Sequence, residues 1–212
     1  TNGIDTDPTN DTISKSLKVG TDSKSLPLTE SFETSIISNG FSISNTDDGL
    51  TWARSTINSS TDGNYSIFMN NHDYDPLNYS GEYGVSNDII FPFINLSDYD
   101  QATMSFDLSA CQFTSLSTPD NNWDSLQVLV STDCGQTFKV IYNKYAASLI
   151  TVPNSANFFK PSNPSQWRTE TIDLSQYAGR DNVLLKFRNI SQFENNIYID
   201  KLNINGNKVT SI

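Results

Sequence analysis

The strongest constraint on the fold of this chain is a set of short segments in which apolar and polar residues alternate strictly. Within Thr103–Leu108, the side chains of Met104, Phe106 and Leu108 share one face, and polar side chains occupy the other. Leu126–Val130 repeats the pattern. A period of two residues is typical of a β-strand with one buried face, and no stretch shows the sustained 3.6-residue period of an amphipathic helix. The chain is therefore expected to be all-β.

Further segments of β-type composition are bounded by Asn, Asp, Gly, Ser or Pro. We expect strands at Leu28–Glu33, Tyr65–Asn70, Asp88–Phe93, Phe138–Tyr142, Trp167–Ile172 and Ile197–Ile204. Val183, Leu185 and Phe187 also alternate with polar neighbours, and one helical turn is expected at Ser175–Ala178, ended by Gly179. The number and spacing of the strands predict an antiparallel β-sandwich of jelly-roll type.

The chain divides into two parts by composition. Residues 1–25 are rich in Thr, Ser, Asn and Asp and have no period, which indicates a polar linker or a loosely attached arm. An edge strand through Ile13–Val19 is the alternative. Residues 26–212 are expected to form the jelly-roll sandwich, because all-β units of roughly 200–250 residues are common. Thr1 is not a natural start, so we expect one domain of a larger multidomain protein.

Charge and composition exclude several classes of function. The 212 residues include 13 Lys and Arg against 24 Asp and Glu, a formal charge of −11 that disfavours binding to nucleic acid. One His and two Cys cannot build a four-ligand Cys/His zinc site, and neither the His-Glu-x-x-His nor the Gly-x-Ser-x-Gly motif is present. No apolar run reaches about 18 residues, so no membrane span is expected. The abundant carboxylate, amide and hydroxyl oxygens suit calcium and sugar hydroxyls.

The two cysteines test the expected topology. If Thr103–Leu108 and Leu126–Val130 form an antiparallel pair, Cys111 lies beyond one end of the pair and Cys134 beyond the other. At about 3.3 Å per residue, the two would be far beyond the ~7 Å Cα separation that a disulfide allows. Both cysteines are therefore predicted to be free.

A change of phase in the last strand points to a site. Ile197 and Ile199 share one face, whereas Leu202 and Ile204 have the opposite parity, so a β-bulge near Asp200 is expected. Asp200 would then be a carboxylate in an apolar strand, which requires a cation or several hydrogen-bond donors. The alternative is an exposed Asp on a solvent face.

Other oxygen-bearing side chains could complete a metal site with Asp200. Glu33 ends the first expected strand, Asp47 and Asp48 form an acidic turn, and Asn71 follows the Tyr65–Asn70 strand. Asp107 ends an alternating strand. Each feature alone is an ordinary surface feature, but together they supply the six to eight oxygens that calcium takes. We therefore expect calcium as the bound metal and these six side chains as its candidate ligands.

The ordered set of segments resembles MAM-like jelly rolls, and more closely the cleaved-adhesin (choice-of-anchor J) domains of gingipain-type and other secreted metalloproteases. The resemblance covers roughly residues 28–205. The matching segments are residues 28–33 (LTESFE), 47–52 (DDGLTW), 87–92 (NDIIFP), 102–107 (ATMSFD), 130–135 (VSTDCG), 167–170 (WRTE) and 198–204 (YIDKLNI).

The resemblance implies a non-catalytic β-sandwich with structural calcium. It also implies a secreted or cell-surface protein, exported by type IX secretion and associated with proteases. In that family the calcium ligands are the Glu of the opening Phe-Glu pair and the Asp of the closing strand, which correspond to Glu33 and Asp200. The acidic turn before the Trp corresponds to Asp47 and Asp48, although family turns often carry a longer Asp-Gly-Asp-Gly run.

Aromatic residues in polar loops are candidates for ligand contacts. Trp123 follows Asn121 and Asn122, a combination of stacking face and planar hydrogen-bonding groups that suits a sugar. Tyr79 and Tyr83 form a second candidate. The alternative is that these rings fold back onto the edge of the sandwich.

The expected function is an extracellular accessory module for adhesion or ligand binding. Its expected partner is a glycan or a host or matrix protein. The alternatives are a carbohydrate-binding module proper and a structural spacer beside a secreted protease. A glycoside hydrolase needs two carboxylates about 5–9.5 Å apart in a cleft, and the sparse Glu residues show no such pattern. The chain is therefore not expected to be an enzyme.

Overall fold

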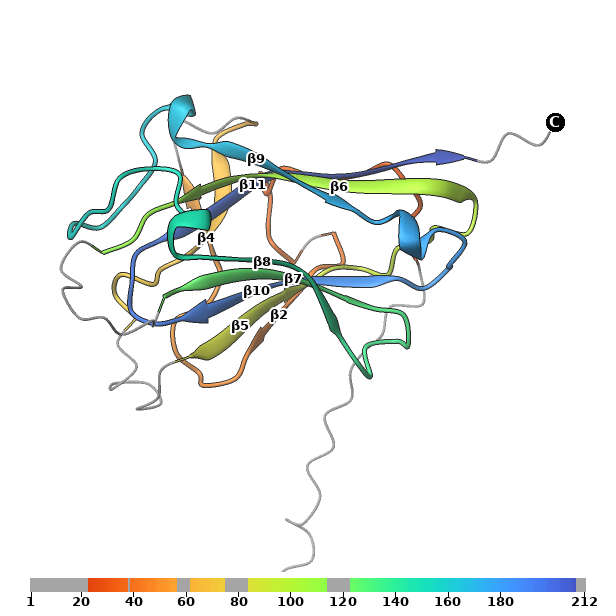
Figure 1. Ribbon diagram of the computed structural model, residues 1–212, viewed down its shortest axis with the longest axis horizontal. Helices are drawn as coiled ribbons and strands as arrows, with labels where there is room; N and C mark the ends of the chain where they lie inside the picture. Colours follow the sequence, from red (N-terminus) through yellow and green to blue (C-terminus); the bar gives the residue numbers. More distant parts are fainter. Residues whose placement is uncertain (1–22, 38, 57–61, 75–83, 114–122, 209–212) are drawn as a thin grey trace, which may run out of the picture.

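Two antiparallel sheets lie face to face in the computed structural model, which describes residues 23–37, 39–56, 62–74, 84–113 and 123–208 (Figure 1). The first sheet has the order β3 (Ala53–Thr56), β4 (Tyr65–Met69), β11 (Ile197–Lys208), β6 (Tyr99–Ala110), β9 (Arg168–Asp173), with β1 (Leu28–Glu30) also paired to β11. The second has the order β2 (Ser42–Asn45), β5 (Val85–Ile90), β10 (Leu184–Ser191), β7 (Ser125–Ser131), β8 (Lys139–Tyr145). The expected antiparallel β-sandwich is confirmed.

Short 3₁₀ helices complete the described secondary structure. They are η1 (Ala146–Ser148), η2 (Pro164–Gln166) and η3 (Ser175–Tyr177). The last confirms the expected helical turn, and Gly179 follows it with a φ of 80° that favours glycine. No helix in the part of the chain described is long and apolar enough to cross a membrane.

The core forms where the alternating strands face each other. Met104, Phe106 and Leu108 of β6 are fully buried, and so is Phe187 of β10 on the facing sheet. The rings of Phe106 and Phe187 meet edge to face, with centroids 4.9 Å apart, so the two layers interdigitate. A smaller cluster of Cys111, Phe159 and Tyr198 covers the outer side of the first sheet.

The expected pairing of the two alternating strands is wrong. β6 lies between β11 and β9, whereas β7 lies in the other sheet between β10 and β8. Both cysteines are nevertheless free, with Cys111 buried and Cys134 exposed, so that part of the prediction is confirmed.

Two strands, β2 and β3, were not expected from the sequence. Both are short and polar, and each lies at the edge of its sheet, where side chains need not alternate with an apolar face. In contrast, β6 and β11 were expected from the sequence, but each is longer than expected, at 12 residues.

The expected arm falls mostly outside the described residues, as does the alternative strand Ile13–Val19. Its last residues are attached to the sandwich. Lys24 donates its backbone N–H to Phe93 O at 2.7 Å and accepts from Asn95 N at 2.8 Å. Lys24, which the sequence assigned to the arm, is therefore hydrogen-bonded to the sandwich.

Candidate functional site

The first sheet has a break where two strands follow one another along one edge of β11. β1 pairs Leu28–Glu30 with residues 202–204, and β4 pairs residues 67–69 with Ile197–Ile199. Asp200 and Lys201 lie between the two pairings, and we call this pair of residues the β11 break. The first and last strands of the domain and β4 therefore converge at one point.

The β11 break is also a β-bulge. The register with β6 shifts between Asp200 and Asn203, and Lys201 has a left-handed φ of 50°. The bulge lets Leu202 enter the core one position out of phase with Ile199, which is the change of parity expected from the sequence. Asp200 then shares the outer side of the sheet with Tyr198, because alternate residues of a strand point the same way.

Asp200 faces a second carboxylate across the ladder. It is the register partner of Asp107 on β6, and the two side chains are 0% and 5% exposed. Asp200 Oδ1 accepts the N–H of Lys201 at 2.7 Å, and Asp107 Oδ1 accepts the hydroxyl of Thr169 at 2.5 Å. Directly opposite side chains lie about 5 Å apart at Cβ, so the β11 break concentrates negative charge.

Glu33 reaches the same junction from the end of β1. Its Oε1 accepts the backbone N–H groups of Asn64 at 2.9 Å and Tyr65 at 2.8 Å, and so caps the beginning of β4. Gly63 has a φ of 81°, and a Cβ there would collide with the Glu33 carboxyl group. Glycine is therefore required at position 63 both for the turn and for the close approach of Glu33.

Arg54 of β3 fixes the turn that carries Glu33, a role that the sequence did not indicate. Its guanidinium donates to the backbone carbonyls of Phe32 (2.8 Å), Thr34 (2.7 Å) and Glu33 (2.6 Å). It also lies 3.8 Å from the centroid of the Tyr65 ring. These three carbonyls are thereby occupied, so a metal ion at this junction would depend on side-chain oxygens.

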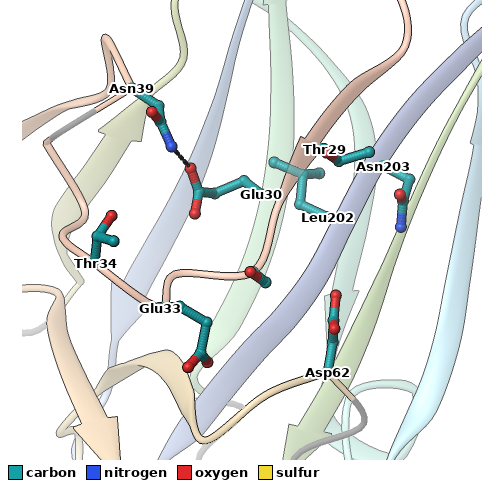
Figure 2. Close-up of a pocket in the computed structure, with 9 residues that line it drawn as sticks. Thr29, Glu30, Glu33, Thr34, Asn39, Asp62, Leu202 and Asn203 are labelled. Atoms are coloured by element: carbon teal, nitrogen blue, oxygen red, sulfur yellow. Dashed lines mark hydrogen bonds between the residues drawn. The ribbon is translucent and has the colours of Figure 1, made fainter.

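An acidic pocket of about 250 Å³ opens beside the β11 break (Figure 2). The carboxyl groups of Glu30, Glu33 and Asp62 lie on its walls together with Asn39 and Asn203. The remaining lining residues are Thr29, Ser31, Thr34 and Leu202. Sequence analysis did not select Asp62, Glu30 or Asn39 as site residues. Glu30 lies within an expected strand, whereas Asp62 and Asn39 lie in segments without a pattern.

Glu30 is already satisfied within the pocket. One carboxylate oxygen accepts the N–H of Phe32 at 2.6 Å, and the other accepts the side-chain amide of Asn39. Within the described residues, no three Asp, Glu, His or Cys side chains lie close enough together to hold a metal. Calcium would therefore need amide and hydroxyl oxygens beside no more than two of the carboxylates, a mixture that this ion accepts.

Three of the six candidate metal ligands lie away from the β11 break. Asp47 accepts the Tyr74 hydroxyl, and Asp48 is an exposed turn residue with a φ of 56°. Asn71 is buried and exchanges amide hydrogen bonds with Asn189 at 3.1 and 2.9 Å. Because Asn71 follows the last residue of β4 and Glu33 caps its first, the two are separated by roughly 20 Å and cannot share an ion.

The candidate ligand surface is only partly described. Trp123 is half-buried immediately before β7. Asn121, Asn122, Tyr79 and Tyr83 lie outside the described residues. A groove of about 440 Å³ not expected from the sequence runs between the edge strands β8 and β9, and it is lined by Lys139, Val140, Ile141, Tyr142, Thr171, Ile172, Asp173 and Gln176.

Comparisons with known proteins relate the chain to solved structures alone, because no family model and no curated protein matches it. The K1 and K3 cleaved adhesin domains of Lys-gingipain from Porphyromonas gingivalis W83 match with TM-scores of 0.58 and 0.55. Each is 18% identical, and each match covers 85% of this chain and 98% of the adhesin domain. The similarity to cleaved adhesin domains expected from the sequence is therefore found in the fold.

A carbohydrate-binding module has the same fold. CBM27-1 of Caldicellulosiruptor saccharolyticus, solved in complex with mannohexaose, matches with a TM-score of 0.52 at 13% identity. The match covers 86% of this chain and 98% of the module. The structural neighbours are thus adhesin and carbohydrate-binding domains of the jelly-roll class.

Proposed function

We propose that this chain is a non-catalytic binding module of a secreted or cell-surface protein, acting in adhesion or ligand capture and stabilised by calcium. The observation that supports it best is the fold match, in which nearly the whole of a cleaved adhesin domain corresponds to 85% of this chain. The resemblance of the sequence segments to the same family supports export by type IX secretion and a place beside a protease in a larger protein.

The described residues support the non-catalytic assignment. His72 is the sole histidine, and its ring nitrogens contact Asp73 Oδ1 at 2.8 Å and Ala156 O at 3.3 Å rather than a nucleophile. Asp107 and Asp200 are sealed from solvent at 5% and 0% exposure, so a glycoside could not reach them. Cys111 is buried, and this burial raises the pKa of its thiol, which disfavours the reactive thiolate.

Calcium is proposed at the β11 break. Glu33 and Asp200 are the ligands implied by the resemblance. Because no three Asp, Glu, His or Cys side chains among the described residues lie close enough together to hold a metal, amide and hydroxyl oxygens would complete the set. An ion there would connect β1, β4, β6 and β11, and would stabilise the strands most prone to fray. Extracellular modules bind calcium at ~0.1–1 mM, so the expected gain at millimolar calcium is about 1 kcal/mol.

The proposed partner is an extracellular glycan or a host or matrix protein. A glycan ligand, the property of a carbohydrate-binding module, is favoured by the match to a module solved with mannohexaose and by the half-exposed Trp123. A purely structural spacer beside a protease is the remaining alternative, and it would bind neither class of ligand.

A glycan and matrix-protein array, probed with the full chain with and without calcium, tests this function. We expect binding to a defined glycan or protein group that falls at least tenfold in Trp123→Ala. Phe158→Ala is the matched control, because Phe158 is an aromatic residue 44% exposed on another loop. Absence of binding across the array would contradict a binding module, and equal losses in both variants would remove Trp123 from the ligand surface.

A further inference from the structure

A pair of buried carboxylates lies outside the β11 break and has no role in the site described above. Asp124 and Glu194 are each 1% exposed. Asp124 directly precedes β7, and Glu194 follows the end of β10 by three residues. Since β7 and β10 are antiparallel neighbours with Ser125 opposite Ile190, the two acids gather at one end of the second sheet.

In each carboxylate, one oxygen accepts a backbone hydrogen bond and the other has no hydrogen-bond partner. Asp124 Oδ1 accepts the N–H of Gln192 at 2.5 Å, and Glu194 Oε2 accepts the N–H of Phe113 at 2.8 Å. Asp124 Oδ2 and Glu194 Oε1 are buried without a hydrogen-bond partner. Among the described residues, neither acid forms an ion pair with Lys, Arg or His.

The surroundings oppose ionisation of both acids. Burial, reinforced by the nearby Glu194, raises the pKa of Asp124 well above its usual value, and hydrogen bonds from Gln192, Glu194 and the Asn71 side chain only partly offset this rise. Burial likewise raises the pKa of Glu194 to about 7. Two buried acids in this setting need either protons or a cation.

The neighbouring polar atoms favour a cation. Ser191 Oγ and Gln192 Oε1 are also buried and have no partner. Both residues precede Glu194 by two or three positions, and the pairing of Ile190 with Ser125 places them next to Asp124. The site therefore offers carboxylate, amide and hydroxyl oxygens, and its donors are backbone N–H groups and the Asn71 side chain rather than a charged residue. Hard divalent cations, and calcium in particular, take such oxygen sets.

We propose that Asp124 Oδ2 and Glu194 Oε1, with the side-chain oxygens of Gln192 and Ser191, form a calcium site distinct from the β11 break. The ion would fasten Phe113 and Asp124 to the turn after β10, because Phe113 already binds Glu194 and Gln192 already binds Asp124. It would also hold Trp123, the neighbour of Asp124, at a fixed place on the proposed ligand surface.

Calorimetric titration of CaCl₂ into the chelator-treated full chain tests the proposal. Glu194→Gln is expected to lose one calcium per chain, or to bind that calcium at least tenfold more weakly. Asp200→Asn keeps this ion even if it loses one at the β11 break, so the two sites are distinguishable. Asp98→Asn, which alters a residue whose side chain is 72% exposed, is the control and keeps the wild-type stoichiometry.

Two results would overturn the proposal. One is a stoichiometry and affinity for calcium in Glu194→Gln that equal those of the wild type. The other is a metal-free double variant, Asp124→Asn with Glu194→Gln, that melts above the wild type while its calcium response is unchanged. That outcome would mean that the carboxyl groups hold protons.

A second measurement applies if the amide variants do not fold. Terbium bound to the wild-type chain is expected to luminesce when Trp is excited at the long-wavelength edge of the protein absorption band, where Trp alone absorbs. Trp123→Phe, which changes a half-exposed residue, removes most of that emission because the donor adjacent to the site is lost. Emission that is unchanged in Trp123→Phe overturns the assignment.

Discussion

Asp200 of β11 lies directly opposite Asp107 of β6, and both side chains are buried. This pairing is a consequence of the bulge at Lys201, which moves Leu202 into the core and leaves Asp200 on the outer side of the sheet. Like charges placed directly across a ladder destabilise it unless donors or a cation compensate. The pairing therefore links a local irregularity of the backbone to the proposed calcium site.

The left-handed backbone at Lys201 predicts an unusual response to glycine. Lys201→Gly is expected to keep or raise the free energy of unfolding, by up to about 1 kcal/mol, because glycine adopts a φ of 50° without strain. Lys201→Val is expected to lose about 1–2 kcal/mol. Urea unfolding measures both. Lys139→Gly, at a β8 position without a left-handed φ, is the control and loses ~0.5–1 kcal/mol; an equal loss in Lys201→Gly would contradict the bulge.

Arg54 is expected to contribute strongly to the junction of β1, β3 and β4. Arg54→Ala leaves three carbonyls without their donor and is predicted to destabilise the chain by ~2–3 kcal/mol. Arg54→Lys is expected to keep only part of this stability, since an ammonium group cannot reproduce the hydrogen-bond geometry of the guanidinium group. Thermal unfolding provides the measurement. The exposed Arg180→Ala is the matched control, and similar losses in the two alanine variants would refute the role of Arg54.

A buried ion-pair network on the second sheet predicts how stability depends on pH. Asp88 accepts from Lys186 Nζ at 2.7 Å and from Arg188 Nε at 2.7 Å. Burial opposes ionisation, but the hydrogen bonds from Arg188 and Lys186 outweigh it and hold the pKa of Asp88 below 3.8. Asp88→Asn would leave the Lys186 charge buried and cost about 3 kcal/mol, or roughly 6–12 °C in Tm.

The sign of the pH effect follows from the lowered pKa. The stabilisation by Asp88 is complete above the ordinary carboxyl pKa near 3.8 and is lost as the pH falls through the lower pKa of the folded state. The gap in Tm between wild type and Asp88→Asn is therefore constant from about pH 5 to 8 and closes below about pH 4. A difference in Tm that widens in acid would contradict the assignment. Asp98→Asn is the exposed control and should change the free energy of unfolding by no more than ~0.5 kcal/mol.

The two thiols are predicted to differ in reactivity. Cys134 is exposed, whereas Cys111 is 1% exposed and packs with Phe159 and Tyr198. A thiol reagent is expected to titrate one group rapidly in the folded chain and two after denaturation. Cys134→Ser should abolish the rapid phase and leave the slow one, and a rapid phase that persists would place Cys111 at the surface.

The sequence predicted the elements whose pattern is apolar. The alternation in β6 and β7 and the change of parity at Asp200 reflect side chains that must reach the core, so the strands and the bulge could be read from the order of residues. β2 and β3 could not, because their polar residues lie at sheet edges and carry no such constraint.

Contacts between residues far apart in the sequence could not be predicted from the pattern of apolar and polar residues. The pairing of β6 with β7 was wrong because these two strands, although consecutive in the chain, lie in different sheets. Asn71 was grouped with Glu33 although the two flank opposite ends of β4. Asp124 and Glu194 are 70 positions apart, and only the pairing of β7 with β10 brings them together. A polar residue directly before a strand is the one local signal that Asp124 offers.

Calcium-dependent thermal unfolding of Glu194→Gln and of the double variant Glu194→Gln with Asp200→Asn tests the central claim most directly. The Glu194→Gln substitution, present in both chains, isolates the β11 break. Each chain is measured in a chelator and in roughly 5 mM CaCl₂. The account predicts that calcium raises the Tm of Glu194→Gln by about 2–4 °C and that this shift disappears when Asp200→Asn is added. The same Tm with and without calcium in the Glu194→Gln chain would contradict a structural ion at the β11 break.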